Sequence, residues 1–100
     1  IKFKKLVNYS NLPKVFGNGK NFISFYQNIQ KINFPMKEIE SFYFFESGRW
    51  DLKLHNNKII KLPVNDYLFS LKNYNDSKDK TNFKVYKTFD YRIKDQLILN

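Results

Sequence analysis

Apolar side chains follow a helical spacing in the first half of the chain. They recur at i, i+3, i+4, i+7 and i+10, which places them on one stripe of an amphipathic helix. Asn21, just before this stripe, is a residue type that commonly caps helix N-termini. The pattern predicts a helix over residues 21–32, docked on a sheet through Phe22, Phe25, Tyr26, Ile29 and Ile32.

Beyond Pro35 the apolar positions recur at every second residue, as in β-strands. Residues 38–45 form a predicted strand whose run 42–45, FYFF, is apolar on both faces, so we expect these aromatic side chains in the core. Residues 49–55 alternate cleanly, with Trp50, Leu52 and Leu54 on one face. This alternation predicts a half-buried strand, with Trp50 packed beneath one of the helices.

The two asparagines at 56–57 mark a hairpin turn, because asparagine tolerates a positive φ better than other non-glycine residues. A two-residue loop would place Ile60 and Leu62 on the polar face. A three-residue loop, 56–58, pairs Leu54 with Ile60 and Leu52 with Leu62, and gathers the apolar residues on one face. We therefore expect the longer loop, with a bulge.

The rest of the chain predicts one more helix and two more strands. Residues 65–74 carry a helical stripe, 73–82 are polar and read as a surface loop, and 83–93 read as a long strand. A turn at Lys94 and Asp95 leads to a last strand over 96–99. A further strand, or an extended arm, is expected over 1–7. The expected fold class is α+β, a mostly antiparallel sheet with two helices packed on it, in a single domain over residues 1–100.

Composition narrows the chemistry. The 100 residues include no cysteine and a single histidine, which excludes thiolate sites and the usual two-histidine metal sites. His55 is expected to be exposed beside the hairpin turn. Arg49 and Asp51, two residues apart on one strand face, are expected to form an ion pair or a cross-strand contact and not a catalytic pair. We therefore predict no enzymatic activity, no catalytic residues, no cofactor and no metal.

The formal charge of +9 suggests a nucleic-acid partner as the alternative function. The excess lies in residues 1–37, which hold lysines and no acidic residue. The aromatic run 42–45 could serve as a stacking platform for single-stranded nucleic acid if it were exposed among basic residues. Because these aromatic side chains are expected in the core, a protein partner is favoured over nucleic acid. No apolar run approaches the roughly 18 residues needed to span a bilayer.

Three segments, taken in order, resemble one protein family. Residues 46–63, ESGRWDLKLHNNKIIKLP, resemble the signature hairpin of the FtsQ/DivIB family of bacterial cell-division proteins, with Asn57 at the usual turn glycine. Residues 11–19, NLPKVFGNG, resemble the family's L-P-x-V-x-G-x-G segment. Residues 89–99, FDYRIKDQLIL, resemble its closing pattern. The form is most similar to the alphaproteobacterial one.

The resemblance implies a non-enzymatic scaffold of the division complex, the divisome. In the family this β domain binds the FtsB and FtsL pair and supports septum formation. We accordingly expect the chain to be the C-terminal β domain on the periplasmic side of the inner membrane. Its single-pass parent would also carry a POTRA domain, a transmembrane helix and a cytoplasmic tail, which are absent from this chain.

The expected docking site is the sheet edge formed by the C-terminal segment. An exposed edge offers unpaired N–H and C=O groups to an incoming strand. In the resembling family the FtsB segment binds here, with a basic residue at the position of Arg92 and commonly an aromatic at that of Ile93. The predicted partner-binding residues are Arg92, Ile93, Lys94, Gln96, Leu97, Ile98 and Leu99.

Overall fold

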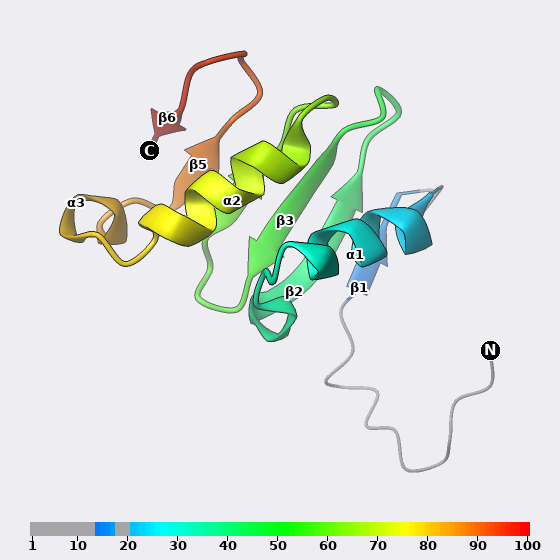
Figure 1. Ribbon diagram of the computed structural model, residues 1–100, viewed down its shortest axis with the longest axis horizontal. Helices are drawn as coiled ribbons and strands as arrows, with labels where there is room; N and C mark the ends of the chain where they lie inside the picture. The colour runs from blue at the N-terminus through cyan, green and yellow to red at the C-terminus, as the bar shows by residue number, and fades with distance from the viewer. Residues whose placement is uncertain (1–13, 18–20) are drawn as a thin grey trace, which may run out of the picture.

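The computed structural model describes residues 14–17 and 21–100. Within them, one six-stranded sheet follows the order of the chain (Figure 1). Its strands are β1 (Lys14–Phe16), β2 (Ile39–Phe44), β3 (Trp50–Leu54), β4 (Ile59–Lys61), β5 (Thr88–Asp90) and β6 (Ile98–Leu99). The helices are α1 (Phe22–Lys31), α2 (Tyr67–Ser77) and α3 (Thr81–Lys84), with a 3₁₀ turn, η2 (Met36–Glu38), before β2. The strand expected over 1–7 lies outside the described residues.

The α+β class is confirmed, but the sheet is mixed. Three neighbouring pairs are antiparallel, whereas β1 pairs with β2 and β4 with β5 in parallel. Parallel neighbours need a crossover connection, and a helical segment stands between the two strands in both cases. The expectation of a mostly antiparallel sheet did not include the short β1, and so it missed the first crossover.

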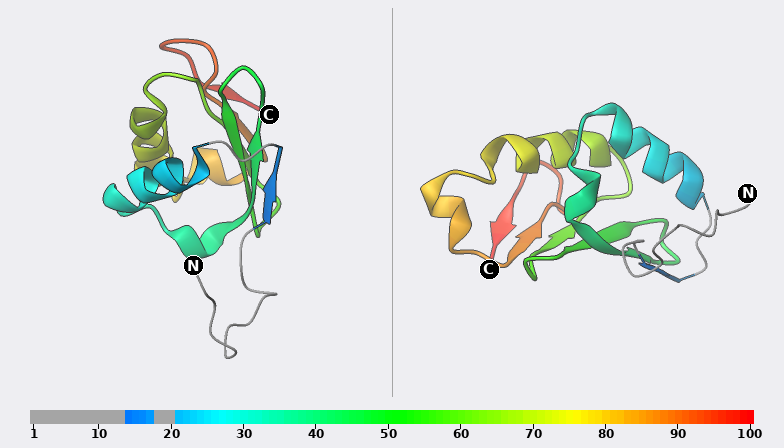
Figure 2. Two further views of the ribbon diagram at one scale, coloured as in Figure 1. Left: turned by 90° about the vertical axis from the view of Figure 1, so that its right-hand side faces the viewer. Right: turned by 90° about the horizontal axis from the view of Figure 1, so that it is seen from below.

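All three helices lie on one face of the sheet, and the core fills the space between the two layers (Figure 2). The predicted stripe of α1 is confirmed, since Phe25 and Ile29 are buried and its other members pack against the core. Trp50 is buried beneath α1, with its ring stacked on that of Phe25 at a centroid distance of 4.7 Å. Phe42 meets the same indole edge to face.

In the β3–β4 hairpin each side chain lies on the expected face of the sheet, but the pairing register differs from the predicted one. Leu52 pairs with Ile60, and the Leu54 N–H donates to the Lys58 carbonyl, so the three-residue turn is 55–57 and not 56–58. A shift of two residues keeps every side chain on its face, and Ile60 and Leu62 are buried with Leu52 as expected. Hydrophobic alternation fixes the parity of a register, but it cannot separate registers that differ by two.

The second half departs further from the expected elements. Helix α2 ends at Ser77 instead of Tyr74. Residues 83–93 were expected to form one long strand, but 83 and 84 belong to helix α3. Phe83 lies in this helix and stacks on Phe89 at 5.5 Å, so its apolar side chain reaches the core from a helix. Only 88–90 form β5. The predicted turn is confirmed by the positive φ of Asp95, 61°.

The opposite face of the sheet carries charged and aromatic side chains, and no helix of the described residues covers it (Figure 2). One row runs across all six strands in register: Phe16, Tyr43, Asp51, Lys61, Asp90 and Ile98. We call this surface the open face. The expected burial of the run 42–45 is therefore half right, because Phe42 points to the core whereas Tyr43 and Phe45 lie on the open face.

Candidate docking site at the C-terminal sheet edge

Strand β6 forms one edge of the sheet and pairs only with β5 among the described strands. Thr88 and Asn100 exchange both of their backbone hydrogen bonds, each 3.1 Å long. In an antiparallel ladder such a pair alternates with a pair that is not hydrogen-bonded, here Phe89 and Leu99. The N–H and C=O groups of Leu99 therefore point away from β5 and are oriented to receive another strand.

The side chains of β6 divide between the two faces. Leu97 and Leu99 pack against the core, whereas Ile98 is exposed on the open face opposite Asp90. Gln96 and Lys94, in the preceding turn, are exposed. The edge thus combines a fixed backbone with few projecting side chains, so a strand could approach without displacing buried groups.

Arg92 is held by a carboxylate of its own chain. Its Nε donates to Asp90 Oδ1 at 2.9 Å and its Nη2 to Asp90 Oδ2 at 2.6 Å, while the Arg92 backbone N–H also donates to Oδ1. These hydrogen bonds hold the pKa of the Asp90 carboxyl below its usual value, against the opposing effect of burial. The guanidinium is positioned at the surface, and Asp90 already compensates part of its charge.

A groove of about 670 Å³ lies beside this edge, between the start of α2 and the turn that joins β5 to β6. Five of the seven predicted partner-binding residues line it: Arg92, Ile93, Lys94, Gln96 and Leu97. The other two, Ile98 and Leu99, form the strand itself. The structure thus brings the predicted set together at one end of the sheet.

Three exposed apolar side chains border the groove. Val64 is 48% exposed, Phe69 74% and Ile93 51%. Sequence reasoning missed Val64 and Phe69 as site residues. One signal in the sequence was available: Phe69 is two residues from Leu71, so on a helix it points away from the buried side of α2 and is expected to be exposed.

The inner wall of the groove is fixed by Tyr91. Its hydroxyl donates to Asn73 Oδ1 at 2.8 Å, which ties the end of β5 to α2. Burial, together with the neighbouring Tyr74, raises the pKa of the Tyr91 phenol. The hydroxyl remains protonated over the physiological pH range, so this hydrogen bond persists.

His55, Arg49 and Asp51 do not line the groove. His55 is exposed in the hairpin turn, as predicted. Arg49 and Asp51 form the predicted ion pair on the open face. Within 14–17 and 21–100, no group of three or more His, Asp or Glu side chains could hold a metal ion.

Among the described helices, none has both the length and the apolarity needed to cross a membrane.

A scan against protein-family models found no match for this chain, and a search of curated proteins found none either.

Proposed function

We propose that this domain is a non-enzymatic docking module of the bacterial division complex that receives a partner strand at β6. The observation that carries the proposal is the outward-facing backbone of Leu99 at a sheet edge, beside a groove that holds five of the residues predicted from sequence. The resemblance of the segments 11–19, 46–63 and 89–99 to the FtsQ/DivIB family supplies the partner class, FtsB and FtsL. It also supplies the location, the periplasmic side of the inner membrane.

Strand addition would give affinity through the backbone and specificity through the groove. The partner chain that pairs with Leu99 passes the turn 91–97, where Ile93 and Phe69 offer an apolar surface. Lys94 lies at the same end of the sheet and adds positive charge beside Arg92. A segment with apolar and acidic side chains therefore fits this site best.

The backbone contribution is tested by Leu99→Pro against Leu99→Ala. Proline removes the N–H that points away from β5, whereas alanine keeps it, and both shorten the side chain. We expect the proline variant to bind an FtsB-type partner at least about tenfold more weakly than the alanine variant in a calorimetric titration. Equal affinities, with both variants folded by circular dichroism, would place the docking surface elsewhere.

The groove is tested by Ile93→Asp with Ile23→Asp as the matched control. Both isoleucines are exposed, but Ile23 lies on α1 and does not line the groove. Only Ile93→Asp is expected to weaken partner binding, again by about tenfold. A loss of the same size in both variants would reflect added charge and would argue against the groove.

A second candidate, binding of single-stranded nucleic acid, is favoured by the open face. The rings of Phe16 and Tyr43 stack there at 4.9 Å, and the Arg49 guanidinium lies 4.3 Å from the centre of the Phe45 ring. Exposed aromatic rings among basic side chains are the usual platform for bases. If this candidate is right, an oligonucleotide will bind with a steep salt dependence, and Phe16→Ala will weaken it. Affinity that is independent of Phe16 contradicts it.

A further inference from the structure

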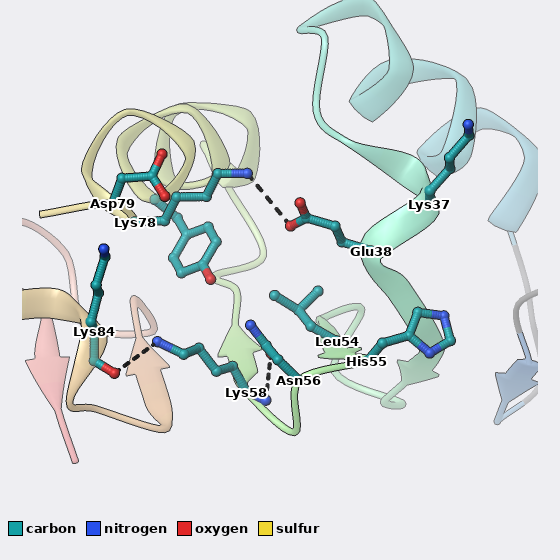
Figure 3. A pocket seen from close by; sticks show the side chains of 10 residues that line it. Lys37, Glu38, Leu54, His55, Asn56, Lys58, Lys78, Asp79 and Lys84 are labelled. Atoms are coloured by element: carbon teal, nitrogen blue, oxygen red, sulfur yellow. Dashed lines mark hydrogen bonds and ion pairs between the residues drawn. The ribbon is translucent and has the colours of Figure 1, made fainter.

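A second pocket, of about 570 Å³, lies at the end of the sheet opposite the groove. Figure 3 shows the side chains that line it. It sits where β4 and β5 begin and where α2 ends, whereas the groove sits where these strands end and α2 begins. Its volume is in the range of pockets that hold small ligands. The lining is mostly polar and basic: Lys37, Glu38, Leu54, His55, Asn56, Lys58, Tyr74, Lys78, Asp79 and Lys84.

Lysines without a carboxylate partner gather around Lys58. Its Nζ donates to the Lys84 carbonyl at 3.3 Å and lies 5.3 Å from the centre of the Phe89 ring, so the amine extends along the pocket floor towards α3 (Figure 3). Among the described residues, Lys58, Lys84 and Lys87 form no ion pair within 4 Å, whereas Lys78 pairs with Glu38. The positive charge at this end is therefore only partly compensated.

The surroundings of Lys58 disfavour its charged form. Burial lowers the pKa of the Lys58 amine, and repulsion from Lys87 and Lys84 lowers it further. An anion between these amines would remove the repulsion and form charge-assisted hydrogen bonds with them. The positive charge of Lys58, Lys84 and Lys87 is therefore not neutralised by a carboxylate of the described residues within 4 Å.

Neutral donors complete the lining. Asn56 Oδ1 accepts the Lys58 backbone N–H at 3.1 Å, which leaves the amide nitrogen of the same side chain available to donate. The buried Tyr74 also lines the pocket, and burial with the nearby Glu38 and Asp79 raises the pKa of its phenol to about 12. Its hydroxyl is thus a donor at neutral pH.

We propose that this pocket binds a small molecule that carries linked phosphate groups, with Lys58 and Lys84 as the cationic anchors and Asn56 and Tyr74 as neutral donors. Phosphate oxygens accept several hydrogen bonds each and match point charges such as lysine amines. A diphosphate spans more of the pocket than a single phosphate and engages both lysines together. Two carboxylates also line the pocket: Glu38, from η2, is paired with Lys78, and Asp79 follows α2, so the anion is expected beside Lys58 and away from both.

The test uses inorganic pyrophosphate as the probe in a calorimetric titration at fixed ionic strength. The parent chain is expected to bind it saturably at one site, and Lys58→Gln and Lys84→Gln are each expected to weaken binding by about tenfold or more. Lys72→Gln is the matched control, because Lys72 is exposed on α2 and does not line the pocket. It removes the same net charge and should leave the affinity unchanged.

Two results would overturn the proposal. One is the absence of saturable binding by the parent chain, and the other is an equal loss in Lys72→Gln, which would show a general effect of net charge. Near-ultraviolet circular dichroism of Trp50 confirms that each variant keeps its core. Since none of these substitutions touches β6 or the groove, this test succeeds or fails independently of partner docking.

Discussion

The two faces of the sheet are stabilised by different physics. On the covered face, Trp50, Leu52 and Phe42 are buried against the helices, and packing of apolar surface dominates. On the open face, Asp51 and Asp90 are also nearly buried, although no helix of the described residues covers them, because neighbouring arginine side chains lie over them. Low exposure therefore arises from the helix layer on one side and from side chains of the sheet itself on the other.

The two Arg–Asp pairs of the open face are also unequal. Burial raises the pKa of the Asp51 carboxyl although Arg49 opposes this, whereas hydrogen bonds from Arg92 lower the pKa of Asp90. Both aspartates pair in register with Lys61, which lies between them. The orientation of each arginine and the depth of each carboxyl thus decide whether ionisation favours or opposes folding.

The largest expected effect is on the covered face. Trp50→Ala removes a buried indole that stacks on Phe25, and should cost about 3 to 5 kcal/mol, enough to unfold or nearly unfold a small domain. Phe45→Ala, on the open face, should cost about 1 kcal/mol or less. Denaturant unfolding of the two variants measures the contrast, and similar losses would show that both faces depend on packing.

Next in size is the loss of the Asp90 carboxylate. Asp90→Ala removes the acceptor of two Arg92 side-chain hydrogen bonds and one backbone N–H, and should cost about 1 to 3 kcal/mol. Arg92→Gln should cost less, because the side chain of Arg92 is 45% exposed and water can solvate what remains. A larger drop in melting temperature for Arg92→Gln than for Asp90→Ala would show that the arginine, and not the buried carboxylate, contributes most of this pair's stability.

Acid titration separates the two aspartates. The lowered pKa of Asp90 means that its contribution is present above the unfolded pKa of about 3.9 and is lost as pH falls below it. The raised pKa of Asp51 has the opposite sign, so its ionisation costs stability as pH rises above about 4. The free energy of unfolding, measured between pH 2 and 6, should fall less on acidification in Asp90→Asn than in the parent. In Asp51→Asn it should rise more steeply with pH than in the parent.

The smallest expected effect concerns Lys61. Its charge lowers the pKa of both aspartates, so Lys61→Gln should raise both values and change stability by about 1 kcal/mol or less. Carboxyl carbon shifts followed by NMR through a pH titration measure the two pKa values separately. A change confined to one aspartate would show that Lys61 belongs to a single pair and does not couple the two.

The candidate docking site was partly accessible from the sequence. Local pattern and the resemblance predicted a strand over 96–99, of which only 98–99 form β6, and placed Arg92 as a charge near it. That Asp90 holds Arg92 was not expected, although the two stand at i and i+2. The helical position of Phe69 indicated exposure, but not that Phe69 and Val64 belong to the site, because their place beside the turn 91–97 depends on how α2 docks.

The sequence alone determined the features that depend on local periodicity. Alternation assigned Trp50, Leu52 and Leu54 to one face, and the helical stripe assigned Phe25 and Ile29 to the core, because side-chain direction follows from backbone repeat. Only the tertiary structure decided what depends on distant partners. The parallel pairing of β1 with β2 and of β4 with β5, the hairpin register and the helical state of 81–84 all depend on contacts between separated segments. Local pattern cannot distinguish registers two residues apart, nor a helix from a strand that delivers Phe83 to the same core.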